Sequence, residues 1–376
     1  MSSPPEKKFP SSPPKSPSSK KSSSAGSPSE ADAGGTATTV EGILPASHWV
    51  EQPLNQDDDA DSTYDDDAAS STASLTSSIF AYRTLHGRTY HSDRHTDAQY
   101  WTPNDDQAMA AGDIIHHLLT LVHDGKLHRA PLDENISRAL DVGTGTGIWA
   151  IDFADIFTNC EVIGTDLSPI QPSWVPPNLK FELVDALNFP WPFPPNHFDY
   201  IHMRYLFGAI PDWNSFIAQA FACTKPGGWV ESFEASCVFR SDDGTLLEGS
   251  AMDQWGKVFV EAGRTKGKPF DVVGEGLVTV AFREAGFEEV TEWEFKCPIG
   301  KWAKDGKLKE IGAYALKATL ADVEGWILRT WNQVMGWSEE EVIVYLAHLR
   351  EQLRDPNVHA YCLMRCVYGR KPLSAA

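Results

Sequence analysis

A glycine-rich turn between an apolar strand and a helix sets the tightest limit on how this chain folds. The stretch RALDVGTGTGIW, residues 138–149, places Gly143, Gly145 and Gly147 directly after a short apolar run. Glycine is needed where the backbone takes a positive φ or comes close to a ligand. The first N–H groups of a helix have no partner within it and are free to bind an acceptor. The turn therefore predicts a site for a phosphate or a nucleotide-like cofactor.

Strand and helix patterns alternate after this turn. Short apolar runs predict strands, and the stretches between them predict helices. The expected strands are residues 138–142, 160–166, 179–186, 198–204 and 227–235, and the expected helices are residues 148–157 and 213–224. This alternation predicts an α/β fold, with a mostly parallel sheet and helices on both faces.

We interpret residues 79–376 as one domain around this sheet. Residues 305–354 are largely helical, and Ser338 with Glu341 forms a capping box inside them. We expect this segment to be an insertion before the last strand that forms a lid over the site. The remaining expected elements are an N-terminal arm and helix within 79–125, a helix over 274–286, a strand over 287–298 and a closing strand over 357–372.

The first 78 residues differ in composition from the rest of the chain. They are rich in Ser, Pro and Lys, and residues 57–67 contain seven aspartates. Such a segment buries too little apolar surface to offset the entropy of ordering, so we expect residues 1–78 to be disordered. Ser16-Pro17, which follows Lys15, and Ser27-Pro28 are candidate phosphorylation sites, which would make the tail a switchable interaction segment.

Composition argues against several other classes of protein. A net charge of −20 gives no general attraction to nucleic acid, which is not expected as a substrate. The six scattered cysteines contain no CxxC pair and predict a reduced protein of the cytoplasm, the nucleus or both. With no apolar run near 18 residues, no membrane span is expected. His116, His117 and His123 lack a metal-binding spacing, so no metal is predicted.

The spacing of the glycines narrows the choice of cofactor. A dinucleotide fingerprint starting at Gly143 needs its third glycine at position 148, where the chain has Ile148. The Lys and Ser/Thr of a P-loop are also missing. The pattern that remains is D-x-G-x-G-x-G, from Asp141 to Gly147.

This pattern resembles the first cofactor motif of the class I S-adenosylmethionine-dependent methyltransferases. The resemblance implies a Rossmann-like sheet of seven strands, most of them parallel. It also implies that Gly143 and Gly145 lie against the methionyl part of the cofactor, within a turn that includes Thr144 and Gly147. Asp141 would orient the turn or reach the cofactor's ammonium group through water.

Two later acidic positions fit the same resemblance. Asp166 ends the second strand, where its carboxylate would accept both ribose hydroxyls, with Leu167 beside it. Asp185 and Ala186 follow the third strand and would bind the adenine amine and a ring nitrogen. A dehydrogenase also uses an acid like Asp166, so NADH binding stays a distant alternative.

Longer stretches resemble the LaeA-like fungal methyltransferases over residues 80–370. They are LDVGTGTGIWAIDFAD, GTDLSPIQP, FDYIHMRYLFGAIPDW, KPGGWVESFE, HGRTYH and HAYCLMRCVYGRKP. That family includes regulators of secondary metabolism and enzymes that methylate natural products. Thr144 stands where some of the regulators have cysteine, in a GCGTG turn, and this departure argues against the global regulator itself.

The carboxyl end of the fourth strand carries the candidate catalytic groups, because functional groups in open α/β sheets gather at strand ends. We interpret His202 as a general base or an acceptor-orienting group, since imidazole titrates near neutrality; a packed strand histidine is the alternative. Met203 is placed beside the cofactor, and Arg204 either holds an anionic substrate or pairs with an acid. Tyr90 of the arm would face the sulfonium in a cation–π contact, unless the arm merely packs on the domain.

Two functional hypotheses follow. The first is an active methyltransferase that modifies a small natural product or a protein side chain. The second is a regulatory protein of methyltransferase fold that acts through protein partners in secondary metabolism or development. An amino-methylating Asn-Pro-Pro-Tyr motif is missing after the fourth strand, and no segment encodes the acceptor.

Overall fold

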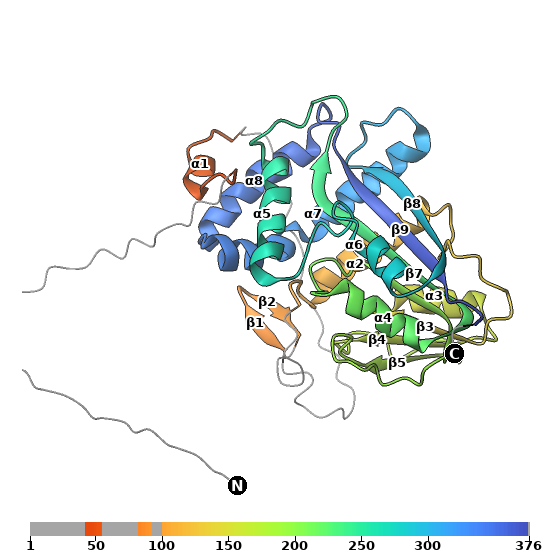
Figure 1. Ribbon diagram of the computed structural model, residues 1–376. Coiled ribbons are helices and arrows are strands. Elements are labelled where there is room, and N and C mark those ends of the chain that lie inside the picture. The colour runs from red at the N-terminus through yellow and green to blue at the C-terminus, as the bar shows by residue number, and fades with distance from the viewer. Residues whose placement is uncertain (1–41, 55–81, 92–99, 375–376) are drawn as a thin grey trace, which may run out of the picture. The chain divides into compact units, whose positions relative to one another are not determined.

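A sheet of seven strands carries the structure (Figure 1). The computed structural model describes residues 42–54, 82–91 and 100–374, which all belong to one unit. The sheet order is β5-β4-β3-β6-β7-β9-β8, and β9 runs antiparallel to both of its neighbours while the first five strands are parallel. The strands are β3 (Arg138–Val142), β4 (Glu161–Asp166), β5 (Leu179–Leu183), β6 (Phe198–Arg204), β7 (Thr224–Arg240), β8 (Glu288–Pro298) and β9 (Tyr361–Arg370). The predicted fold class is confirmed.

Helices pack on both faces of this sheet. They are α2 (Asp106–Val122), α3 (Ile148–Ile156), α4 (Trp213–Cys223), α5 (Ala251–Lys266), α6 (Leu277–Glu284), α7 (Gly306–Met335) and α8 (Glu339–Arg354). None of the helices in the described part of the chain is both long and apolar enough to cross a bilayer. The capping box of Ser338 and Glu341 begins α8, as predicted.

Alternate residues of the central strands serve opposite layers. Ala139 of β3 and Tyr200 of β6 pack with Trp149 and Phe153 of α3. Their neighbours Leu140 and Ile201 pack with apolar residues of α4 and α6 on the other face. Side chains alternate between the two faces along a strand. The faces of these four residues therefore determine the faces of all the remaining residues of β3 and β6.

Two segments differ from the expectations. β7 runs on to Arg240, five residues past the predicted strand, and α5 follows it in a region where no element was predicted. α7 and α8 together fill the segment expected to be helical, but α7 has a break at Asp322, where φ is −145° and ψ is 35°. The sequence of residues 305–354 reads as largely helical, so it did not predict the break at Asp322.

Part of the expected disordered tail is ordered, so the prediction for residues 1–78 is wrong at residues 42–54. A short helix, α1 (Ala46–Val50), lies beside α8 (Figure 1). The Trp49 side chain is only 3% exposed and meets the Tyr345 ring edge-on at 5.2 Å. The apolar residues of ILPASHWV bury enough surface to order this piece inside a polar tail. Ser16 and Ser27 lie outside the described residues.

The N-terminal arm forms a hairpin that is tied to two helices. Its strands are β1 (Arg83–Leu85) and β2 (Arg88–Tyr90). The Arg88 guanidinium donates to Asp105, the N-cap residue of α2, at 2.6 and 2.7 Å. It also donates to Asp322, at the break in α7, at 2.7 and 3.1 Å. We call this three-residue contact the Arg88 bridge. It joins the hairpin, α2 and α7.

Candidate functional site

The three glycines of the turn are required for different structural reasons. All three have a positive φ, which L side chains rarely adopt. A Cβ on Gly147 would lie 2.3 Å from the Phe181 ring, and one on Gly143 would lie 2.7 Å from the Leu206 side chain. Among the described residues, a Cβ on Gly145 would meet no atom within 4 Å, and Gly145 lines the cavity. Gly143 and Gly147 therefore allow close packing, while Gly145 leaves the backbone open to a ligand.

Asp141 holds the turn from behind. Its carboxylate accepts the Thr144 hydroxyl at 2.6 Å and contacts His202 Nδ1 at 2.7 Å, and the side chain is almost fully buried. The Gln171 amide donates to the Gly145 carbonyl at 2.7 Å from the other side. These contacts place Asp141 where it orients the turn.

His202 does not reach the cavity, which contradicts its expected role as a base that touches the acceptor. The imidazole stacks on the Trp149 ring with the centroids 3.7 Å apart, and it is only 2% exposed. Burial lowers its pKa despite the opposing contact with Asp141, which favours the neutral ring. The cause is strand parity, because His202 shares the face of Tyr200 and points to α3.

Acidic groups at the ends of β4 and β5 border the cavity. Asp166 accepts the Gly145 N–H at 2.9 Å and the Ser168 N–H at 3.0 Å. Burial raises the pKa of Asp166 to about 6, against the effect of these hydrogen bonds. Asp185 accepts the Leu187 N–H at 2.9 Å. Both carboxylates are thus held by backbone groups while they line the cavity.

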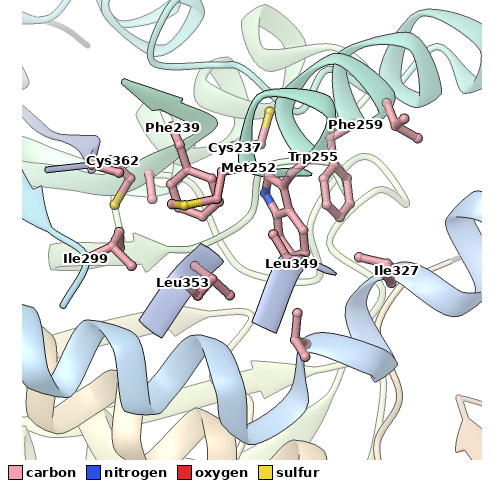
Figure 2. Close-up of a cluster of buried hydrophobic side chains, with 14 of the residues drawn as sticks. Cys237, Phe239, Met252, Trp255, Phe259, Ile299, Ile327, Leu349, Leu353 and Cys362 are labelled. Carbon is pink, nitrogen blue, oxygen red and sulfur yellow. The ribbon is translucent and has the colours of Figure 1, made fainter. Parts of the chain in front are cut away.

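The cavity has a volume of about 350 Å³ and extends from the glycine turn into an apolar space between helices. We call that space the chamber; its walls include Phe239, Trp255, Phe259, Ile299, Ala315, Ala318, Trp326 and Met364. Figure 2 shows Trp255 and Phe259 of α5 opposite Leu349 of α8 and Ile327 of α7. A space with such walls suits an apolar ligand.

The cavity brings together seven of the eleven residues predicted to bind the cofactor. Those that line it are Gly143, Thr144, Gly145, Asp166, Leu167, Asp185 and Ala186. The other described candidates lie behind its wall: Asp141, Gly147, Met203 and Tyr90. Tyr90 is fully buried below the Arg329 guanidinium, 5.2 Å from its ring centre, so the arm packs on the domain there.

Sequence reasoning missed several wall residues. Asn104, Lys268 and the chamber residues of α5 and α7 line the cavity, yet they belong to no recognisable motif. His91, which follows β2, also lines it. A signal for His91 existed, because HGRTYH was singled out as part of the arm, but the sequence does not tell which of its side chains faces inward.

A loop after β6 forms another part of the wall and is held by a buried acid. Tyr205 has a φ of 54°, and Leu206 and Phe207 follow it along the cavity. Glu234 of β7 accepts the N–H groups of Leu206 and Phe207 at 2.9 and 3.0 Å through one carboxylate oxygen. Burial raises the pKa of Glu234 to about 8.

The raised pKa of Glu234 makes stability depend on pH. Between the ordinary value of 4.5 and about 8, the folded state keeps a proton that the unfolded state releases. The free energy of unfolding therefore falls as pH rises through that window. Glu234→Gln keeps the acceptor oxygen and cannot ionise. We expect this variant to match the wild type at pH 4.5 and to exceed it by about 2–5 kcal/mol at pH 8.5. Urea unfolding at both pH values measures this difference. If the free energy of unfolding changes equally with pH in the two proteins, the prediction is wrong.

The sheet order, the glycine turn after β3 and the acids after β4 and β5 define a class I methyltransferase fold. A family model described as a methyltransferase domain matches residues 114–292. The methyltransferase pytC of Aspergillus terreus is 38% identical over 307 residues, which is 81% of this chain and 93% of that protein. The secondary metabolism regulator LAE1 of Cochliobolus heterostrophus is 31% identical over 291 residues, 76% of this chain and 94% of that one.

The chain therefore belongs to the LaeA-like fungal family of class I S-adenosylmethionine-dependent methyltransferases. Among solved structures, phosphoethanolamine N-methyltransferase 2 of Haemonchus contortus, in complex with S-adenosyl-L-methionine, matches with a TM-score of 0.45. It is 17% identical, and the match covers 76% of this chain and 62% of that one.

Proposed function

We propose that this chain binds S-adenosylmethionine at the glycine turn and methylates a small, largely apolar acceptor held in the chamber. The observation that carries the proposal is the continuity of one cavity from Gly145 and Asp166 to Trp255 and Phe259. We further propose that the acceptor is a secondary metabolite, because the apolar walls of the chamber suit a small natural product. Six free, buried cysteines support a location in the cytoplasm or nucleus.

The residues at the turn fit this cofactor. Gly145 leaves open space where the methionyl part would lie. Asp166 ends β4 and lines the cavity, where its carboxylate would accept the ribose hydroxyls. Asp185 and Ala186 would bind the adenine. When bound, the cofactor supplies a methyl group attached to a positively charged sulfur.

The protein's own contribution is positioning and the exclusion of water. Asp141 and Gln171 hold the turn, and Glu234 holds the loop of Leu206 and Phe207 that faces it. Holding two reactants in a fixed arrangement supplies up to about 7–11 kcal/mol of a reaction barrier. An acceptor that must lose a proton would meet the imidazole of His91, because His91 lines the cavity and His202 does not, although both residues are 2% exposed.

The second hypothesis is a regulatory protein of methyltransferase fold that acts by binding protein partners. The relative named as a secondary metabolism regulator favours it. The chamber favours a small acceptor, because its aromatic and aliphatic walls match an apolar molecule better than the polar backbone of a polypeptide.

Labelled S-adenosylmethionine and a fungal host extract test the proposal. We expect the label in an organic-soluble small molecule with the wild type. Ala318→Phe fills the chamber, so we expect it to bind S-adenosylhomocysteine normally in calorimetry and to lose transfer to that molecule. Leu247→Phe changes an exposed site and should behave as the wild type. Label recovered in a protein would show that the acceptor is a protein side chain and not a small molecule, and absent binding of S-adenosylhomocysteine to the wild type would refute the first hypothesis.

A further inference from the structure

Arg204 places a positive charge at the cavity wall. It ends β6, and its side chain lines the cavity. Among the described residues, no carboxylate lies within the 4 Å of an ion pair with its guanidinium. Burial lowers its pKa, although the nearby Asp141 opposes this effect. A buried cation is costly unless it is paired, so this guanidinium is suited to an anionic ligand.

Two further side chains hold the guanidinium in place. Arg204 Nη2 lies 3.1 Å from His116 Nδ1, and His116 Nε2 lies 2.9 Å from an oxygen of Asp152. A guanidinium only donates hydrogen bonds, so Nδ1 must be the acceptor and Nε2 must carry the proton that Asp152 accepts. His116 is thus a neutral imidazole with one defined tautomer. His116 therefore orients the Arg204 guanidinium and leaves the positive charge of Arg204 uncompensated.

The strand order indicates which anion Arg204 would meet. β3 and β6 pair Val142 with Met203, so Arg204 lies across from Gly143, the first residue of the turn. β4, which carries Asp166, lies on the other side of β3. The ribose site, the glycine turn and Arg204 therefore follow one another along the carboxyl edge of the sheet. A cofactor with its ribose at Asp166 extends its amino-acid end across the turn towards β6.

We propose that Arg204 binds the α-carboxylate of the cofactor's methionyl end, and that His116 and Asp152 are positioning residues for it. This assignment rests on the proposed cofactor site and adds the side chain that binds the amino-acid end of the cofactor. The alternative ligand for this cation is an acidic substituent of the acceptor, and the experiment separates the two.

The test compares two ligands that differ in one group. S-adenosylhomocysteine carries the carboxylate, and its decarboxylated analogue, 5′-deoxy-5′-(3-aminopropylthio)adenosine, does not. Calorimetry on the full chain should show the wild type binding S-adenosylhomocysteine about 10- to 100-fold more tightly than the analogue. Arg204→Met should lose this preference and bind the analogue as the wild type does. Arg138→Met, at the opposite end of β3, should keep it.

The outcomes are distinct. A wild type that binds neither ligand refutes the proposed cofactor site. A wild type without preference, or a preference retained in Arg204→Met, overturns the role of Arg204 while the cofactor site stands. If Arg204→Met fails to fold, Arg204→Lys serves: a reduced preference supports the proposal, and an undiminished one overturns it. His116→Phe should weaken the preference several-fold, and an unchanged value removes His116 and Asp152 from the proposal.

Discussion

Replacing Arg88 by methionine will lower the free energy of unfolding by about 3–5 kcal/mol, the usual cost of leaving one member of a buried ion pair alone. The Asp322 side chain is fully buried, and the Arg88 side chain is only 14% exposed. Burial already raises the pKa of Asp322, and Arg88 offsets this only in part. Without the guanidinium, Asp322 is a buried acid at a break in α7. Urea unfolding at pH 7 measures the loss.

Two further variants show whether the buried charge is the cause. Adding Asp322→Asn to Arg88→Met removes that charge, so we expect it to restore part of the lost stability. Arg264→Met breaks an exposed pair with Glu261 on α5 and should change stability by less than about 1 kcal/mol. A loss below about 1 kcal/mol in Arg88→Met would show that the Arg88 bridge is not needed to hold α7.

Alanine at Gly145 will weaken cofactor binding much more than it weakens the fold. The substitution places a methyl group in open space on the cavity wall, at a φ of 58°. Backbone strain costs about 1–2 kcal/mol of stability, while the methyl group occupies the space expected for the cofactor. We expect the affinity for S-adenosylhomocysteine to fall about 10- to 100-fold. Calorimetry and urea unfolding on the same preparation separate the two effects.

Two other glycines provide the matched comparisons. Gly336→Ala, at the end of α7, introduces similar strain at a φ of 69° in open space among the described residues, away from the cavity. It should lose the same stability and keep full affinity. Gly147→Ala collides with the Phe181 ring as well, so we expect a larger loss of about 2–5 kcal/mol in stability. Equal affinity in Gly145→Ala and the wild type would place the cofactor elsewhere.

The sheet was predictable because each of its central strands is a short apolar run with a turn signal after it. The length of an apolar run and the position of the turn after it are local properties of the sequence. They predicted the ends of β3, β4, β5 and β6 to within a few residues. It was also predictable that His202 and Tyr200 lie on the same face of β6, because they are two residues apart in one strand. The contact with Trp149 was not readable, since it depends on how α3 packs over the sheet.

The chamber could not be predicted from sequence for a different reason. Its walls come from α5, α7 and the extension of β7, whose apolar residues have the same pattern as ordinary core residues. Whether Trp255 or Ala318 faces a cavity or a neighbour depends on the packing of distant segments. The ordered helix α1 was missed because composition was averaged over a long polar tail, which concealed the eight residues of ILPASHWV.

The division of the cavity between two sets of elements has an evolutionary consequence. The groups at the cofactor end stand on strand ends and turns of the sheet, whereas α5 and α7 supply much of the chamber wall, together with Phe239 of the β7 extension and Met364 of β9. Substitutions in α5 and α7 therefore reshape the chamber while the donor end stays intact. We therefore expect relatives with this arrangement to differ in their acceptors through the surfaces of these helices, and chimaeras that exchange the helices between relatives to carry acceptor choice with them.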